Sequence, residues 1–378
     1  LGEGAAAVAA AAEQQGNIKT LCGIKPDQTA VDFSRKADVH GDLVGPSLNA
    51  ADAVLLGFDL KFNRSLTSLD LYNNEIGAGG AKAIAGTILQ SALKSLTINV
   101  ELNIEDLKTS ASINLSGKGL RMEEAIIVAK CMEFNRALIS ANLDYNNIGD
   151  EGAIAISAAL ESNTTLEDLS LKSYDGGTQI TAAGAQAIAK MLVVNRALNT
   201  LDLSNNNIGG VSGYVKKDKL QGTSFKKGDT VQYNGQQCIV FMEEDSDGDL
   251  KVQNMCGVIA IAEALKFNRA LNSLDLCNND LGEASETIAQ AVLQHPTMEV
   301  FCNIPMKKMR EDSVTELDLS GKGSIGAHGA MVIAPLLEFS RALKSVDLRY
   351  NSIPDEGCRQ LRAAVGNKSI TLQLEPQR

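Results

Sequence analysis

Tryptophan is absent from this 378-residue chain, and aromatic residues make up only 4% of it, although 44% of the residues are hydrophobic. Leu, Ile and Ala are therefore expected to fill the core. No run of 18 apolar residues occurs, so no transmembrane helix is predicted. The formal net charge of -11 argues against nucleic acid as the main partner, because binding to the phosphate backbone depends on Lys and Arg. Another protein, with a basic or polar surface, is the more consistent partner.

Motifs for catalysis and metal binding are missing as well. The three histidines, at positions 40, 295 and 328, have no nearby nucleophile motif, and no phosphate-binding loop is found. The seven cysteines are scattered without a C-x-x-C motif or a Cys-His pair. We therefore predict no enzymatic activity, no cofactor and no metal site, and we expect a reducing compartment, the cytoplasm.

Residues 1–17 form an Ala-rich segment of low complexity. This composition is compatible with a frayed helix, a linker or the remnant of a processed leader, and we favour the linker. A processed leader would instead place the protein in an organelle.

What the sequence does contain is an internal repeat. Five times a helix-like stretch ends in Arg, a small residue and Leu, and a short strand-like segment follows, at residues 62–66, 134–138, 194–198, 267–271 and 339–343. The Asn that precedes this Arg in four of them is expected to end the helix in the left-handed conformation, and the Arg to complement the helix dipole. Repetition at successive helix ends argues against catalysis by any of these Arg residues.

Each junction opens a unit with Leu at the first, fourth and sixth positions and Asn three residues later, as at Leu66, Leu69, Leu71 and Asn74. Such Leu side chains point into one core, and an apolar helical run covers its other side. The pattern resembles the long, helix-containing leucine-rich repeat of ribonuclease inhibitor, the Ran GTPase-activating protein and NOD-like receptors. The resemblance implies an α/β fold, a curved solenoid with a parallel sheet inside, helices outside and a ladder of Asn side chains.

A second level of repetition is visible in two 72-residue blocks, from Leu66 to Leu138 and from Leu271 to Leu343. Each block contains one shortened unit. In the turns that follow these units, Lys118 and Lys322 stand where the ladder Asn is expected.

An insertion of about 45 residues separates a strand from its helix. It divides the chain into an N-terminal segment at 1–17, repeats at 18–210, an inserted module at 211–254 and further repeats at 255–378. Asn234-Gly235 is a strong hairpin signal, and the surrounding short strands resemble small SH3-like barrels of the Tudor and Mind-bomb kind. We expect this module to project from one rim of the solenoid. Residues 243–249 match a calcium loop only in part; we interpret them as a solvated turn, with cation binding left open.

Two sets of exposed positions recur in the repeats. One is a column of mostly acidic residues on the strands, which would attract cations, although Leu-Asp-Leu is also the commonest form of this repeat. The other comprises variable aromatic and charged residues just after the strands, including a longer loop at Tyr174, and suits binding hot spots. The predicted partner-binding residues are Asp70, Tyr72, Asn142, Asp144, Tyr145, Lys172, Tyr174, Asp202, Asp275, Asp347, Arg349 and Tyr350. The predicted surface of the insertion comprises Tyr214, Lys216, Lys217, Phe225, Tyr233 and Phe241.

These features predict a non-enzymatic protein-protein interaction scaffold, acting as a subunit of a larger assembly, that binds through its concave face and the inserted module. One alternative is a regulator of a small GTPase, by analogy with the Ran GTPase-activating protein. The other is a peptide or nucleic-acid reader acting through the insertion, where lysines accompany Tyr214, Phe225 and Tyr233. The identity of the partner is not written in the sequence.

Overall fold

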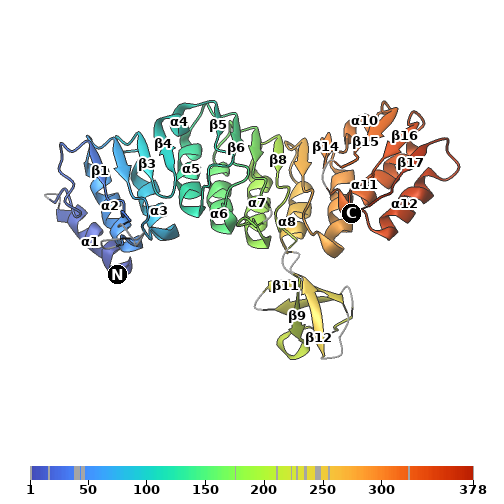
Figure 1. Ribbon diagram of the computed structural model, residues 1–378, viewed down its shortest axis with the longest axis horizontal. Coiled ribbons are helices and arrows are strands. Elements are labelled where there is room, and N and C mark those ends of the chain that lie inside the picture. The colour runs from blue at the N-terminus through green and yellow to red at the C-terminus, as the bar shows by residue number, and fades with distance from the viewer. Residues whose placement is uncertain are drawn as a thin grey trace. The chain divides into compact units, whose positions relative to one another are not determined.

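The computed structural model of the protein describes residues 2–15, 18–37, 43, 47–174, 176–209, 212–222, 224–226, 229–233, 236–242, 248–253, 256–321 and 324–377. The predicted turn at Asn234-Gly235, most of the acidic segment 243–249 and Lys322 lie outside these residues. The chain divides into two compact units, Leu1–Leu166 and Glu167–Arg378. Both are built from short strands that alternate with helices (Figure 1).

The first unit contains the following elements in chain order: α1 (Gly2–Gln15), β1 (Ala30–Asp32), α2 (Ala50–Phe62), β2 (Ser68–Asp70), α3 (Gly77–Ile88), β3 (Ser95–Thr97), β4 (Glu101–Asn103), α4 (Ile104–Thr109), β5 (Ser112–Asn114), α5 (Met122–Phe134), β6 (Ser140–Asn142) and α6 (Gly149–Leu160).

The second unit contains β7 (Asp168–Ser170), α7 (Ala182–Val194), β8 (Thr200–Asp202), β9 (Ser212–Lys216), the 3-10 helix η1 (Lys217–Lys219), β10 (Thr230–Tyr233), β11 (Gln236–Met242), β12 (Asp249–Gln253), α8 (Cys256–Leu265), β13 (Ser273–Asp275), η2 (Gly282–Ala284), α9 (Ser285–Gln294), β14 (Val300–Phe301), α10 (Met306–Arg310), β15 (Glu316–Asp318), α11 (Gly326–Phe339), β16 (Ser345–Asp347), α12 (Asp355–Val365) and β17 (Thr371–Gln373).

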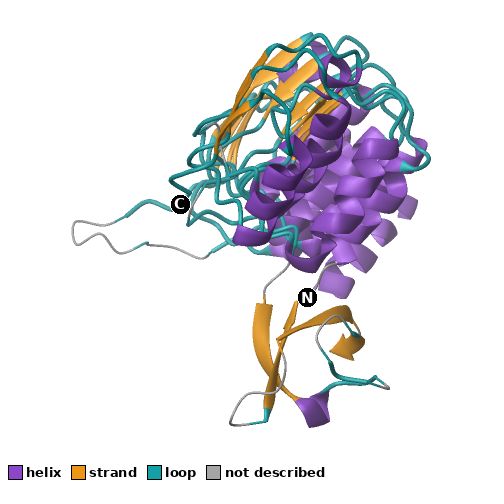
Figure 2. Ribbon diagram, turned by 90° about the vertical axis from the view of Figure 1, so that its right-hand side faces the viewer, coloured by secondary structure: helices purple, strands orange, loops and turns teal. Residues whose placement is uncertain are grey.

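The repeat strands are short because each presents a single central side chain to the core. In the first unit β1, β2 and β3 pair in parallel, which sets Val31, Leu69 and Leu96 side by side, all buried. In the second unit β7, β8, β13 and β14 pair in parallel, as do β15, β16 and β17. Helices cover the opposite side of the core in each unit (Figure 2). The predicted mixed α/β repeat architecture is thereby confirmed.

Asparagines that are buried, or half-buried at Asn74, join repeats to the ones before them at the strand exit. Asn74 Nδ2 donates to the carbonyl of Phe33 at 2.9 Å, and Asn146 Nδ2 donates to the carbonyl of Leu115 at 2.8 Å. In the second unit the same bond is made by Asn206, Asn279 and Asn351, to Leu171, Leu203 and Leu319. These amides satisfy backbone groups that would otherwise be buried without a partner. The predicted Asn ladder is confirmed.

The helix-end asparagines act differently from the expectation. Asn63, Asn135 and Asn195 have extended backbones, with φ between -77° and -69°, so the predicted left-handed helix ends are wrong. Instead the Oδ1 of each accepts the backbone N–H groups two and three residues on, as Asn135 does from Ala137 and Leu138. Asn135 Nδ2 also donates to the carbonyl of Leu107 in the preceding repeat, at 3.1 Å. The side chain therefore caps the corner and forms a second ladder.

Where the last junction has Ser340 in place of Asn, a residue from another repeat supplies the cap. Asp312 Oδ1 accepts from Ser340 Oγ at 2.8 Å and from the backbone N–H of Arg341 at 2.9 Å. These hydrogen bonds lower the pKa of Asp312. An acid 28 residues upstream thus takes over the function of the missing amide.

The N-terminal segment is helical, not a linker. Helix α1 places Ala5 and Ala12 in buried positions and lies against α2, where Lys61 forms an ion pair with Glu13. The prediction of a linker, which the composition favoured, is wrong because small Ala side chains can pack closely against a neighbouring helix.

The inserted segment forms its own antiparallel sheet in the strand order β10-β11-β12-β9. Its core comprises Val215, Leu220, Val231, Cys238, Val240, Leu250 and Val252. It lies in the chain between β8 and α8.

Candidate partner-binding surface

The acidic column has a structural role at the strand exits. Asp70 Oδ1 accepts the backbone N–H of Tyr72 at 2.9 Å, and Asn142, Asp202, Asp275 and Asp347 make the same bond two residues on, at 2.7 to 3.1 Å. Such Asx turns explain why Asp or Asn recurs here. Within each unit the column is aligned, since Asp32 faces Asp70 and Asp202 faces Asp275 in register. Asp32 is exposed and the other side chains named here are half-buried, so part of each reaches solvent.

Two tyrosines occupy a backbone conformation that normally suits Asn. The second residue after the last strand Leu has φ between 56° and 61°; it is Asn at 73, 205 and 278, but Tyr at 145 and 350. The left-handed region is unfavourable for a bulky residue and tolerable for Asn. Tyr145 and Tyr350 are nevertheless 45% and 42% exposed, so core packing does not account for them. Strained residues of this kind cluster at functional sites.

The predicted residues at the end of the second unit bind each other. Arg349 Nη2 lies 2.6 Å from Asp347 Oδ2, and Arg349 Nε also donates to this carboxylate. The hydrogen bond lowers the pKa of Asp347 and raises that of Arg349. The pair leaves Tyr350 beside a largely neutralised patch rather than a negative one.

Asp144, Lys172 and Tyr174 lie at strand exits as predicted, and all three are half-buried. Tyr174 replaces the ladder Asn of its unit, and its carbonyl accepts the N–H of Gly177 at 3.1 Å. A Cβ on Gly177 would lie 2.8 Å from the Tyr174 ring, so the longer loop is packed against this side chain.

The structure also brings together residues that the sequence leaves apart. Asp275, Cys277 and Cys302 meet at the end of β13, with their ligand atoms within 4.8 Å of one another. Burial raises the pKa of Asp275, and neighbouring Asp202 raises it further. The prediction of no metal site was made without this cluster in view, because a search for C-x-x-C spacing cannot find potential ligands that come from two different repeats.

In the inserted module, Lys216 and Lys217 are exposed as predicted, and Lys217 Nζ lies 5.6 Å from the centroid of the Phe225 ring. Phe225 itself is partly buried against the core of the module. Tyr214, Tyr233 and Phe241 belong to β9, β10 and β11, but their side chains lie outside the described part of the chain.

Sequence reasoning missed a row of exposed apolar side chains at the helix ends. Phe134, Val194, Phe267 and Phe339 are 50%, 53%, 62% and 80% exposed. Their signal was present in the repeated junction, which we interpreted only as a helix end. Lys130 Nζ lies 4.7 Å from the centroid of the Phe134 ring. These helix-end side chains are a second set of candidate contact positions in each unit, distinct from the tyrosines at the strand exits.

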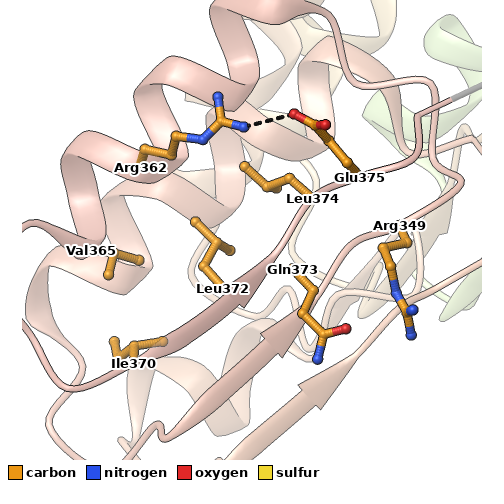
Figure 3. Close-up of a pocket in the computed structure, with 8 residues that line it drawn as sticks. All are labelled: Arg349, Arg362, Val365, Ile370, Leu372, Gln373, Leu374 and Glu375. Atoms are coloured by element: carbon orange, nitrogen blue, oxygen red, sulfur yellow. Dashed lines mark hydrogen bonds and ion pairs between the residues drawn. The ribbon is translucent and has the colours of Figure 1, made fainter.

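A cavity of about 580 Å³ lies between α12 and β17 (Figure 3). Its lining combines aliphatic side chains with an ion pair from Arg362 Nη2 to Glu375 Oε1 at 3.1 Å, and comprises Arg349, Arg362, Val365, Ile370, Leu372, Gln373, Leu374 and Glu375. None of these eight residues is a Ser, Cys or His that could act as a nucleophile or general base.

The fold and these surfaces define a mixed α/β repeat protein. The model of the family described as "Leucine Rich repeat" matches residues 62–85, 139–157, 194–214 and 339–361. The ribonuclease inhibitor of Sus scrofa is 27% identical over 294 residues, covering 66% of this chain and 60% of that protein. NACHT, LRR and PYD domains-containing protein 14 of Homo sapiens is 24% identical over 318 residues, covering 82% of this chain and 24% of that protein. The chain therefore carries leucine-rich repeats and is homologous to these proteins, while spanning less than two thirds of their lengths.

Among solved structures, leiomodin-1 actin-binding site 2 is 19% identical, covers 55% of this chain and 90% of that chain, and superposes with a TM-score of 0.34. Across the described residues, no helix combines the length and the apolar character needed to cross a membrane.

Proposed function

We propose that this chain is a non-enzymatic protein-binding scaffold whose partner contacts the strand exits. These are Tyr72, Asp144 and Tyr145 in the first unit and Lys172, Arg349 and Tyr350 in the second. The observation that carries the proposal is the pair of exposed tyrosines, Tyr145 and Tyr350, in left-handed conformations where other repeats have Asn. A fold that needed only stability would place Asn there. Tyrosine supplies a large contact area and a hydrogen-bonding hydroxyl, which suits an interface anchor.

The relatives support a role in binding, since one of them is a ribonuclease inhibitor. The partner proposed here is a protein with a basic or polar surface, because half-buried Asp144 borders Tyr145 and the Asp347–Arg349 ion pair borders Tyr350. Formation of a stable complex with that partner is part of the proposal. All seven cysteines are free thiols, which supports a reducing compartment such as the cytoplasm.

We further propose that residues 211–254 are an SH3-like module that extends the contact. Support comes from the antiparallel order of its strands and its separate apolar core. Lys216 and Lys217 give it a basic edge, which would face an acidic part of the partner or of a peptide.

The test compares how much two sets of residues of this chain contribute to the binding of one partner. The full chain is used as bait, co-purified proteins are identified by mass spectrometry, and the main partner is then purified and titrated by calorimetry. Replacement of both tyrosines, Tyr145→Asn and Tyr350→Asn, should weaken binding by at least about 30-fold, roughly 2 kcal/mol, as expected for hot-spot residues. The matched control replaces two exposed helix-end rings, Phe267→Ser and Phe339→Ser, and should leave the affinity within a factor of about 3.

The opposite pattern, with binding lost in the Phe variant and kept in the Tyr variant, would move the contact to the helix ends and end this proposal. Deletion of residues 211–254 separates the two parts of the hypothesis. Binding that is weakened but retained supports a shared interface, whereas complete loss assigns the contact to the module alone.

A further inference from the structure

The side chains of Asp275, Cys277 and Cys302 form a compact cluster of three different ligands. Their oxygen and sulfur atoms all lie within 4.8 Å of one another. Cys277 and Cys302 are 2% and 0% exposed, whereas Asp275 is half-buried and connects the cluster to solvent. One cation bonded to all three would draw these atoms to about 3.5 Å from one another, because metal-sulfur and metal-oxygen bonds of about 2.0–2.3 Å set the spacing of a tetrahedral shell, so the cluster must contract on binding.

Backbone N–H groups hold two of the three ligands in place. Cys277 donates its N–H to Asp275 Oδ1 at 2.8 Å, and Leu276 donates its N–H to Cys302 Sγ at 3.4 Å. Hydrogen bonds of this kind stabilise negative charge on the acceptor. They also orient first-shell ligands in metalloproteins, where their loss costs affinity.

The equivalent repeat of the first unit provides an internal comparison. Asp70, Tyr72 and Thr97 occupy the positions of Asp275, Cys277 and Cys302, because Thr97 pairs with Asp70 in register just as the residue before Cys302 pairs with Leu274. There the N–H of Leu71 donates to the backbone carbonyl of Thr97 at 2.8 Å. In the second unit the sulfur of Cys302 accepts the corresponding bond instead, and Cys302 has φ 47°.

This difference has a local cost and a chemical result. A left-handed conformation is unfavourable for Cys, so the sequence accepts strain at the residue that brings the second thiol to the first. In the first unit Tyr72 and Thr97 occupy the positions of the two thiols, so the same fold accommodates other side chains there. The core itself therefore does not require sulfur at either position.

We propose that Asp275, Cys277 and Cys302 bind a thiophilic divalent cation of the Zn²⁺ class, with two sulfur ligands, one carboxylate oxygen and water in the fourth position. Two thiolates with one oxygen ligand favour such a cation over Ca²⁺ or Mg²⁺, which prefer oxygen throughout. On binding, each thiol loses its proton to solvent and forms a metal-sulfur bond, and no electron is transferred.

The surroundings determine how binding depends on pH. A hydrogen bond from Cys302 lowers the pKa of the Cys277 thiol, but burial and Asp275 outweigh it and raise the pKa overall; burial raises the pKa of Cys302 well above its ordinary value. The thiols are thus protonated in the metal-free protein at neutral pH. Metal binding must release their protons, so affinity should increase with pH. Asp202 and Lys172 act on Asp275 with opposite charges.

The experiment uses the full, reduced chain and Co²⁺ as a spectroscopic probe, followed by displacement with Zn²⁺. We expect one Co²⁺ per chain and a thiolate-to-cobalt charge-transfer band in the near ultraviolet. Cys277→Ser and Cys302→Ser should each remove this band and weaken Zn²⁺ binding by more than the ~10–100-fold that second-shell changes cost. Asp275→Asn should weaken binding while keeping the sulfur band. Cys131→Ser, at another buried free thiol, is the matched control and should leave both unchanged.

Calorimetry in buffers of different ionisation enthalpy should show proton release on binding, and the release should be reduced in the Cys277→Ser chain. Circular dichroism checks that each variant folds; if Cys302→Ser does not fold, Cys277→Ser and Asp275→Asn still decide the question. Equal Zn²⁺ affinity in the unmodified chain and the Cys277→Ser chain would overturn the proposal. So would recovery of Cys277 and Cys302 as a disulfide from a chain that binds no Co²⁺ after reduction.

Discussion

The imidazole of His328 meets the ring of Phe301 nearly edge-on, with 5.9 Å between the ring centroids and an interplanar angle of 73°. His328 is 2% exposed, and its Nε2 has no hydrogen-bond partner among the described residues. Helix α11 thus places a titratable ring in the apolar core of the second unit. Burial lowers the pKa of His328 to about 4.

This contact predicts a pH-dependent stability. The unfolded His has a pKa of about 6.5, so the folded state excludes a proton that the unfolded chain binds. The free energy of unfolding should therefore fall as the pH decreases from about 6.5 to about 4, by up to about 3 kcal/mol from this group. In urea unfolding followed at pH 7, 5.5 and 4.5, His328→Phe should remove that part of the decrease. Parallel curves for the two chains would show that His328 does not titrate in this range.

The Asn ladder predicts a large loss from one substitution. Asn146 is 3% exposed and bonds to the carbonyls of Leu115 and Leu143 and to the N–H of Leu120. Asn146→Ala removes these hydrogen bonds and leaves the buried N–H of Leu120 without its acceptor, which should destabilise the first unit by about 2–3 kcal/mol. Exposed Asn367 is the control, and Asn367→Ala should change the free energy of unfolding by less than about 0.5 kcal/mol. Similar midpoints for both variants in urea would contradict the ladder's energetic role.

Two glycines in helices should respond in opposite directions. A Cβ on Gly152 would meet Ile148 and would lie 2.9 Å from Ala125 Cβ, where α6 packs on α5. Gly152→Ala should therefore destabilise by about 1–3 kcal/mol through overpacking. Gly86 in α3 has open space around the same position, so Gly86→Ala should stabilise by about 0.5–1 kcal/mol. Thermal unfolding of both variants measures the two changes in stability. Stabilisation by Gly152→Ala would mean that α6 packs on α5 more loosely than the Cβ separation of 2.9 Å indicates.

The strained tyrosine predicts a variant that is more stable but binds less well. Tyr145 has φ 56°, close to the 61° of Asn73 in an earlier repeat. Tyr145→Asn should relieve strain and raise the free energy of unfolding by about 0.5–1 kcal/mol. Tyr72 precedes the left-handed position, so Tyr72→Asn should give no such gain. Chemical unfolding of both variants tests the effect without knowledge of the partner; a loss of stability in Tyr145→Asn would assign the side chain a packing role.

Much of the repeat architecture could be predicted from the sequence, because it depends on local patterns. Helices α2, α5, α7 and α11 end at Phe62, Phe134, Val194 and Phe339, the first residues of the repeated junctions. The Leu spacing identified the strands, and the Asn three residues after Leu71 or Leu143 identified the ladder. The sequence predicted the candidate binding residues only as a set of equivalent positions in the repeats. The repeat pattern shows which residues face outward, but it does not show which of them have strained backbones or form ion pairs.

The sequence by itself determined the period of the repeat, the apolar side chains of the core and the ladder amides, since one unit repeats the same requirements every time. Tertiary structure alone decided the features that join different repeats. It decided that helix-end Asn residues remain extended and cap the corner, that Asp312 serves Ser340, and that Cys302 lies beside Cys277. The bonds between repeats, from Asn135 to Leu107, from Ser340 to Asp312 and from Leu276 to Cys302, depend on the register of neighbouring repeats, which brings residues 26 to 28 positions apart within bonding distance. No local pattern encodes that register directly, because it results from burying the Leu side chains of neighbouring strands in one shared core.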